Sequence, residues 1–461
     1  MTVFTDEQQS SKDWILNNDG ILLIEAGAGT GKSFMSKEIV KALKPKSGYY
    51  TAFNKAIVEE GVNRFKGYNV TPKTFHALAY KYFSPELKIE DFAYTSINEH
   101  ITYADKRLVI DAMDSFFVSA STSMSDYFEE YFKSHRNKEK MCDICQNYVL
   151  SMNIQKIPPT FNFMLKYLHL LLKDNPGLIC VDLLILDEIN DVTAVSLEIF
   201  KLINAPKKLG LGESNQAIYE FLNLVNGFEE LKNEATIMKY TQSYRCSKEI
   251  ASKIDKKMKS VLNKDFDFKG TNDPVANGKT LYCTATNSAI VSEIENRLSL
   301  NKGFNLLRKP SEIFAAPLAL LSASTGKTPY QKKYKFLVDA FEDYKDQSKH
   351  KTYFKFLTEE VNDTEINNAV NVLMALKSKN VNLFDLYKKA KEAPKDNDFT
   401  IATVFTSKGL EFERVYICDD LNRQFKKALT GELLEKESLT VKRCYYVACS
   451  RAGRLLLNHI L

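Results

Sequence analysis

Cysteine and histidine are few and scattered in this 461-residue chain, which holds eight cysteines and six histidines. Cys142 and Cys145 form the only CxxC pair, and no second Cys or His pair follows at the spacing of a zinc ribbon. The pattern therefore argues against a structural metal framework. Reduced thiols in an intracellular protein are the expected state.

The sequence also lacks a long apolar run and a leader segment. No run approaches the roughly 20 apolar residues that a membrane-spanning helix needs. The first residues, MTVFTDEQQSSKDW, are polar and acidic, which is not the pattern of a signal peptide. No low-complexity tract and no repeat of fixed period is visible. We expect a cytoplasmic, intracellular protein with no membrane partner.

Neither sign of charge dominates. The 63 Lys and Arg residues exceed the 58 Asp and Glu residues by five. So small an excess permits a nucleic-acid partner without arguing for one, because such binding depends on a local basic surface. The length is too great for one compact core, so two or more domains are expected.

Short apolar runs alternate with segments of helical spacing, which predicts an α/β fold with parallel sheets. Residues 21–25 read ILLIE and residues 181–188 read VDLLILDE, as buried parallel strands do. Two stretches rich in helical spacing interrupt this alternation. We expect a first core at 1–79 and 176–240 with a helical insertion at 80–175, and a second core at 241–290 and 396–461 with a helical insertion at 291–395.

A glycine-rich loop follows the first apolar run and precedes a segment of helical spacing. It reads Ala26, Gly27, Ala28, Gly29, Thr30, Gly31, Lys32, Ser33, close to the G-x-x-x-x-G-K-S pattern. Glycines let the backbone amides face phosphate groups. Lys32 is expected to reach the β- and γ-phosphates of ATP, and the Ser33 hydroxyl to ligate Mg²⁺. A similar string, Ser324 to Thr328, lacks the preceding glycine and a leading strand, so we expect a loop between helices there.

Two carboxylates end the apolar run at 183–186. An NTPase uses one carboxylate to hold Mg²⁺ and another to activate the attacking water. Asp187 is expected to take the metal role, with Ser33, and Glu188 the role of general base. An apolar strand that ends in two acids is common, and only the glycine-rich loop upstream makes this pair informative.

The order of the motifs resembles the UvrD/Rep-like branch of superfamily 1 DNA helicases. The matching segments run from Phe4 to Ala452 in the family's order and leave both insertions uncovered. Besides the phosphate loop and the acidic pair, they include FTDEQ at 4–8, TAFNKA at 51–56, TFHALA at 74–79, GESNQAIYEF at 212–221, QSYR at 242–245, TVFTSKGLEF at 403–412 and YVACSRA at 446–452.

The resemblance implies roles for residues that spacing alone does not single out. Around ATP these are Gln8 and Tyr244 at the adenine, Glu411 at the ribose, and Gln216, Arg245 and Arg451 at the γ-phosphate. On DNA they are Phe53, Asn54, Thr74, His76, Tyr219, Phe221 and Asn287. Two readings stay open. Tyr219 and Phe221 alternate and could be core residues of a strand, and His76 could be a packed or capping residue.

Four residues depart from the family's pattern. Asn190 replaces a Gln, Glu213 an Asp, Phe405 a His and Ala285 an Arg. The second insertion is also short for the family, which questions strong unwinding more than movement along DNA.

The resemblance implies two RecA-like cores in tandem, each with a mostly helical insertion, and a 3′ to 5′ helicase or translocase that uses ATP and Mg²⁺ on single-stranded and tailed duplex DNA. Replication or recombination proteins are possible partners. A translocase that strips proteins or remodels recombination intermediates is the alternative, and an inactive nucleic-acid-binding protein is a remote one.

Overall fold

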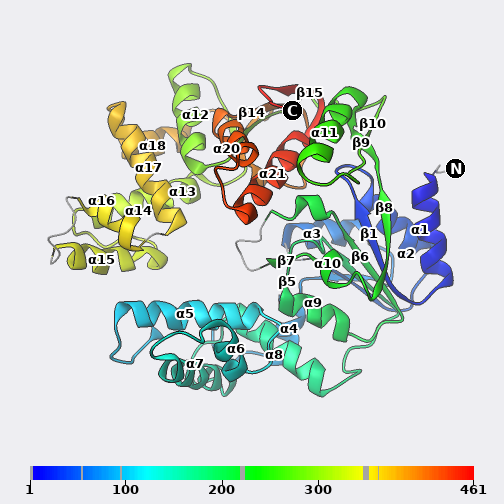
Figure 1. Cartoon of the computed structure of the whole chain (residues 1–461), viewed down its shortest axis with the longest axis horizontal. Coiled ribbons are helices and arrows are strands. Elements are labelled where there is room, and N and C mark those ends of the chain that lie inside the picture. The colour runs from blue at the N-terminus through cyan, green and yellow to red at the C-terminus, as the bar shows by residue number, and fades with distance from the viewer. Residues whose placement is uncertain (1–3, 53–54, 94–95, 219–223, 346–351, 362) are drawn as a thin grey trace. The chain divides into compact units, whose positions relative to one another are not determined.

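A computed structural model describes residues 4–461 apart from 53–54, 94–95, 219–223, 346–351 and 362. The chain divides into two compact units, an N-terminal unit (Met1–Thr241) and a C-terminal unit (Gln242–Leu461). Each unit contains a parallel sheet with helices around it (Figure 1). The fold is therefore α/β with two parallel-sheet cores in tandem, as the sequence predicts.

The N-terminal unit is built on a six-stranded sheet in the order β3-β2-β4-β6-β1-β8. Every neighbouring pair in it is parallel. The carboxyl ends of all six strands therefore lie at one edge. The strands are β1 (Gly20–Ala26), β2 (Gly48–Ala52), β3 (Thr71–Lys73), β4 (Leu183–Asp187), β6 (Lys207–Gly212) and β8 (Ala235–Tyr240). A separate antiparallel pair joins β5 (Val192–Thr193) to β7 (Leu224–Val225).

Helices cover both faces of this sheet. Successive side chains of a strand point to opposite faces, so both sets of side chains are buried. Leu22 and Ile24 of β1 pack in one core cluster and Leu23 in another. A strand buried on both sides must be apolar throughout, which explains runs such as LLILD in β4. The covering helices are α1 (Asp6–Asn17), α2 (Lys32–Leu43), α3 (Lys55–Arg64), α4 (Phe75–Phe83), α9 (Ala194–Leu202) and α10 (Gly227–Glu230), with the 3₁₀ turn η2 at Ser214–Gln216.

Within the described residues, the four helices that follow α4 form the insertion of this unit. They are α5 (Tyr103–Val118), α6 (Met124–Tyr131), α7 (Lys138–Asn153) and α8 (Phe161–Asp174). In Figure 1 they gather into one bundle beside α4 and α9. Their buried aromatic residues, among them Phe117 and Phe163, belong to the same core cluster as Leu184 and Leu186 of β4. The insertion therefore shares its core with the sheet.

One lysine is buried inside this bundle. Lys166 of α8 is 2% exposed, and its Nζ donates hydrogen bonds of 2.7 Å to the carbonyls of Ser119 and Ser121, just after α5 ends. Burial lowers the pKa of Lys166 to about 7. Below pH 7 the folded state must keep a charge in the core, whereas the unfolded chain keeps it in water until about pH 10.4.

The stability of the wild type relative to Lys166→Met is therefore expected to rise with pH. Above pH 7 the folded protein releases the proton while the unfolded chain retains it. The free energy of unfolding of the wild type, relative to that of Lys166→Met, therefore rises by about 2 kcal/mol between about pH 7 and pH 9. His169 stays neutral in this window, because burial and then the charges of Lys166 and Lys173 lower its pKa to about 4. Urea unfolding of both proteins at the two pH values measures the effect. A pH-independent difference would contradict it.

The C-terminal unit has a five-stranded parallel sheet in the order β12-β13-β11-β14-β15. Its strands are β11 (Thr280–Thr284), β12 (Asn305–Leu306), β13 (Phe399–Thr403), β14 (Phe412–Ile417) and β15 (Ala452–Leu457). A parallel pair, β9 (Gln242–Ser247) and β10 (Lys269–Thr271), stands apart from it. The helices that flank these strands are α11 (Lys248–Val261), α12 (Asn287–Ser299), α19 (Val404–Ser407), α20 (Asp419–Thr430) and α21 (Glu435–Cys449).

The insertion of the C-terminal unit is helical and packs around its own aromatic and aliphatic core, which reaches Ile401 of β13. It comprises α13 (Pro310–Ile313), α14 (Ala315–Ala323), η4 (Lys332–Tyr334), α15 (Phe336–Lys345), α16 (Tyr353–Phe356), η5 (Leu357–Val361), α17 (Thr364–Ser378) and α18 (Leu383–Glu392). The string from Ser324 to Thr328 follows α14 rather than a strand. It is the interhelical loop that the sequence predicts.

Candidate nucleotide and DNA sites

The glycine-rich loop joins the carboxyl end of β1 to the first turn of α2. Gly29 and Gly31 have φ values of 72° and 89°, which residues with a Cβ rarely adopt. Thr30 closes the loop by donating from its backbone and its hydroxyl to the carbonyl of Gly27, at 3.2 and 2.8 Å. No side chain caps α2, so its amino end is available to an anion.

Lys32 and Glu188 meet at the edge of the sheet where β1 and β4 end. The Lys32 Nζ lies 3.1 Å from the Glu188 Oε1, and both side chains are less than one-fifth exposed. Glu188 has a φ of 55°, in the left-handed region that glycine favours. Strain of this kind is stored at functional sites more often than elsewhere. The geometry brings the predicted phosphate-binding cation and the predicted base into direct contact.

Asp187 contacts one residue of the neighbouring strand β2 and one of helix α3. The Tyr50 hydroxyl donates a hydrogen bond to its Oδ2, and the Arg64 Nη1 lies 3.7 Å from the same oxygen. Arg64 also donates to the Tyr50 hydroxyl at 3.1 Å. Burial and then the charge of Glu188 raise the pKa of Asp187, against the effects of Lys32, Tyr50 and Arg64. Sequence reasoning did not identify Tyr50 and Arg64, because nothing in their local pattern marks them.

The donors present fit a magnesium ion bound together with phosphates. Within the described residues, no group of three or more His, Cys, Asp or Glu side chains could hold a metal. Mg²⁺ commonly takes one or two protein ligands and completes its shell with phosphate oxygens and water. Exposed Ser33 and buried Asp187 are oxygen donors of that kind, although no hydrogen bond joins them among the described residues. Their shared metal site stays a prediction.

Gln8 contacts the phosphate loop itself. Its Nε2 donates to the carbonyl of Thr30 at 3.2 Å, and its Oε1 accepts the backbone N–H of Thr5 at 3.2 Å in the capping box of α1. The side chain is 3% exposed. The second hydrogen of the Gln8 amide takes part in neither bond and is available to adenine. The adenine contact that the resemblance implies stays a prediction.

The segment after β6 is tied to the segment after β4. Gln216 donates from its amide to the Glu213 carboxylate, the backbone N–H of Glu213 donates to the Asn190 Oδ1 at 2.9 Å, and the Asn190 Nδ2 donates to the Asp191 Oδ2 at 3.2 Å. Gly212 is required here, since a Cβ would lie 2.4 Å from the Asn190 Oδ1. Asn190, a departure from the family's pattern, thus links the predicted γ-phosphate sensor to Asp191, whose backbone N–H donates to the carbonyl of Glu188 at 2.9 Å.

The arginines predicted from motif position lie together within the C-terminal unit. Arg245 of β9 donates to the carbonyl of Ser450 at 3.2 Å, and its Nε lies 3.4 Å from the Glu411 Oε2. Arg451 is 1% exposed and donates to the carbonyls of Val447 and Leu410 at 2.9 and 3.3 Å.

The other two predicted residues of this unit are placed differently. Tyr244 is 46% exposed, as a ring that stacks on a base requires. Asn287 opens α12, and its Oδ1 is buried with no hydrogen-bond partner in the described part of the chain.

Thr74 and His76 line a pocket of about 540 Å³ beside the helical insertion of the N-terminal unit. Thr74 caps α4, because its hydroxyl accepts the N–H of Ala77 at 3.1 Å. His76 lies 3.4 Å from the Asn162 Oδ1 and edge-on to Phe161, with ring centroids 6.1 Å apart. Burial lowers the pKa of His76, so the ring is neutral at pH 7. Phe161 is 53% exposed, and sequence reasoning missed it because it lies 85 residues beyond His76.

Four predicted DNA contacts, Phe53, Asn54, Tyr219 and Phe221, lie outside the described residues. Their roles stay predictions. No helix in the described part of the chain is long and apolar enough to cross a membrane.

Comparison with known proteins agrees with this arrangement. The family model for the UvrD-like helicase C-terminal domain matches residues 72–458. F-box DNA helicase 1 of Gallus gallus is 24% identical over 508 aligned residues, which cover 98% of this chain and 48% of that protein. F-box DNA helicase protein 1 of Schizosaccharomyces pombe is 23% identical over 523, covering 98% and 57%. The chain thus spans about half the length of these relatives. The match over most of its length places the chain in the family of UvrD-like helicases.

Proposed function

We propose that the chain is an ATP-driven motor that moves 3′ to 5′ along single-stranded DNA and unwinds tailed duplexes. The observation that carries this proposal is the contact between Lys32 and Glu188 at the carboxyl edge of the sheet, with Asp187 beside it. The direction rests on resemblance, since AIYEF follows Gln216 where the 5′ to 3′ branch has a proline-containing sequence.

ATP hydrolysis would begin with a change of partner for Lys32. When phosphates bind to the loop between β1 and α2, the Lys32 ammonium group would leave Glu188 and pair with them. The freed carboxylate then accepts a proton from the attacking water. Ser33 and Asp187 would hold Mg²⁺, which would supply charge neutralisation for the phosphate oxygens. By the family resemblance, Arg245 and Arg451 would supply further positive charge at the γ-phosphate, as arginine fingers do.

DNA binding is expected to extend to Phe161. Its exposed ring borders the pocket that contains Thr74 and His76. Phe161→Ala should weaken single-stranded DNA binding by about 1–3 kcal/mol, because one stacking surface is lost. ATPase activity without DNA should not change. Fluorescence anisotropy measures the affinity, and Tyr131→Ala removes an equally exposed ring of the same insertion as a control. Equal losses in the two variants would refute a specific role for Phe161.

Binding to single-stranded DNA should depend steeply on salt and little on sequence. Phosphate contacts release counterions, and aromatic stacking accepts any base. A salt series on several unrelated oligonucleotides tests the proposal. A strong preference for one sequence that persists at high salt would count against a motor.

A translocase that strips proteins from DNA is the second candidate, and the shortness of the insertion between 291 and 395 favours it. Bare duplex substrates separate the two, because only a helicase displaces their strands. Either activity suits a DNA-associated intracellular protein acting with replication, repair or recombination proteins.

A further inference from the structure

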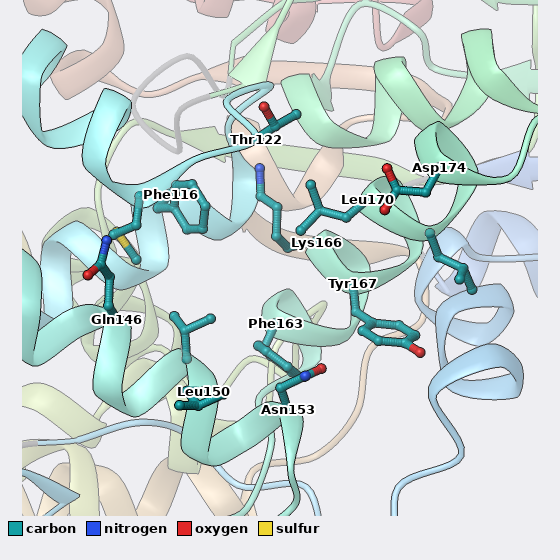
Figure 2. A pocket seen from close by; sticks show the side chains of 13 residues that line it. Phe116, Thr122, Gln146, Leu150, Asn153, Phe163, Lys166, Tyr167, Leu170 and Asp174 are labelled. Carbon is teal, nitrogen blue, oxygen red and sulfur yellow. The ribbon is translucent and has the colours of Figure 1, made fainter.

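A second pocket, of about 460 Å³, opens within the helical insertion of the N-terminal unit. It shares no lining residue with the pocket that contains Thr74 and His76. Figure 2 shows its side chains arranged around an open centre, with Leu150 and Asn153 of α7 facing Tyr167 and Leu170 of α8. None of these residues belongs to the proposed ATP or DNA sites.

The lining residues make the pocket a groove between two helix faces. Those of α7 are Gln146, Val149, Leu150 and Asn153, and those of α8 are Phe163, Lys166, Tyr167, Leu170, Leu171 and Asp174. Spacings of three and four residues put each set on one side of its helix. Phe116 and Met124 add apolar surface from α5 and α6. Leu150 of this lining is 57% exposed, and Ile154, the residue that follows α7, is 62% exposed and extends the apolar surface beyond the pocket. A third helix can pack in a groove of this kind.

Lys166 gives the groove a positive charge in its protonated form, which prevails below its pKa of about 7. Two of the three N–H donors of its ammonium group bind the carbonyls of Ser119 and Ser121. No carboxylate lies within 4.0 Å of its Nζ among the described residues, although the side chain is 98% buried. In Figure 2 the amine lies on the Thr122 side of the pocket. The Nζ also lies over the ring of Phe116, 4.6 Å from its centroid. None of these partners carries a negative charge, so the buried ammonium group favours a ligand with an anionic group.

We propose that this groove binds an amphipathic helix of a partner protein, and that one Asp or Glu on the apolar face of that helix pairs with Lys166. The lining residues lie within 146–153 of α7 and 163–174 of α8. At about 1.5 Å per residue, the groove accepts roughly two to three helical turns. DNA is a poorer fit, because the one lining cation, Lys166, is buried and offers no row of contacts to successive phosphates.

A displayed library of helical peptides of about 14 residues tests the proposal. Peptides are selected on the full chain and then measured as soluble peptides. We expect enriched sequences to carry apolar residues at spacings of three and four around one central Asp or Glu. Leu150→Asp should weaken their binding by about tenfold or more. Leu429→Asp, at an exposed apolar residue of α20 in the other unit, is the matched control and should not change it.

Lys166→Met tests the ion pair. It should weaken an acidic peptide by about tenfold and leave the Asn or Gln version of that peptide unchanged. Urea unfolding confirms that both chain variants are folded. The proposal is overturned if no peptide is enriched, if enriched peptides lack an acid, or if binding survives Leu150→Asp. Binding of decanoate alone would assign the groove to small carboxylates. Self-association that Leu150→Asp abolishes would assign it to a second copy, and displacement by an oligonucleotide would assign it to DNA. Each of these three results also overturns the proposal.

Discussion

Lys32→Ala is expected to reduce ATP hydrolysis by at least about 10²- to 10³-fold, because the phosphates lose their fixed cation. The same substitution removes the ion-pair partner of Glu188, 3.1 Å away. Steady-state ATPase assays with and without single-stranded DNA measure the effect. Stability should change little, since the Lys32 side chain is partly exposed.

Two further variants make this result specific. Lys37→Ala removes an exposed lysine from the same helix, α2, and should retain wild-type hydrolysis. Glu188→Gln should bind ATP and hydrolyse it very slowly, because the water loses its base. Near-wild-type turnover by Lys32→Ala or by Glu188→Gln would contradict the assignment of this pair.

Arg245→Ala is expected to lower kcat for ATP hydrolysis by about 10³-fold, while ATP binding to the N-terminal unit persists. Arg245 projects from β9 and contacts the carbonyl of Ser450, beside Arg451. Arg245→Lys should not restore the rate, because lysine lacks the planar fork of the guanidinium group. Stopped-flow binding of a fluorescent ATP analogue, measured with steady-state turnover, separates binding from chemistry.

The control for charge is Arg308→Ala, which removes an exposed arginine that pairs with Glu312 in the helical insertion. It should leave turnover unchanged. If Arg245→Ala retains wild-type kcat, or if it loses ATP binding and turnover together with its melting transition, Arg245 has a structural role and not a catalytic one.

The longer strands could be predicted from sequence, and the shortest ones could not. β1 and β4 contain apolar runs long enough to indicate buried strands, and the apolar residues of the edge strand β8 also mark it. β3 and β12 have three and two residues and include polar ones. Each forms only because a longer neighbouring strand is already in place: β3 pairs with β2, and β12 pairs with β13. β12 therefore lies inside a stretch that reads as helix.

The candidate site shows the same division. Lys32 and Glu188 could be brought together from sequence, because both follow strands whose carboxyl ends lie at one edge of a parallel sheet. The contacts of Asp187 with Tyr50 and Arg64 could not, since no motif in the sequence marks either partner. Phe161 was missed for the same reason. Contacts across the fold depend on packing that no local pattern records.

The most direct test of the motor is the displacement of a labelled strand from duplexes that carry a 3′ or a 5′ single-stranded tail, with ATPase measured in the same reactions. The account predicts hydrolysis stimulated by single-stranded DNA and displacement from the 3′-tailed duplex only. It is contradicted if DNA does not stimulate hydrolysis, or if the 5′-tailed duplex is the one unwound.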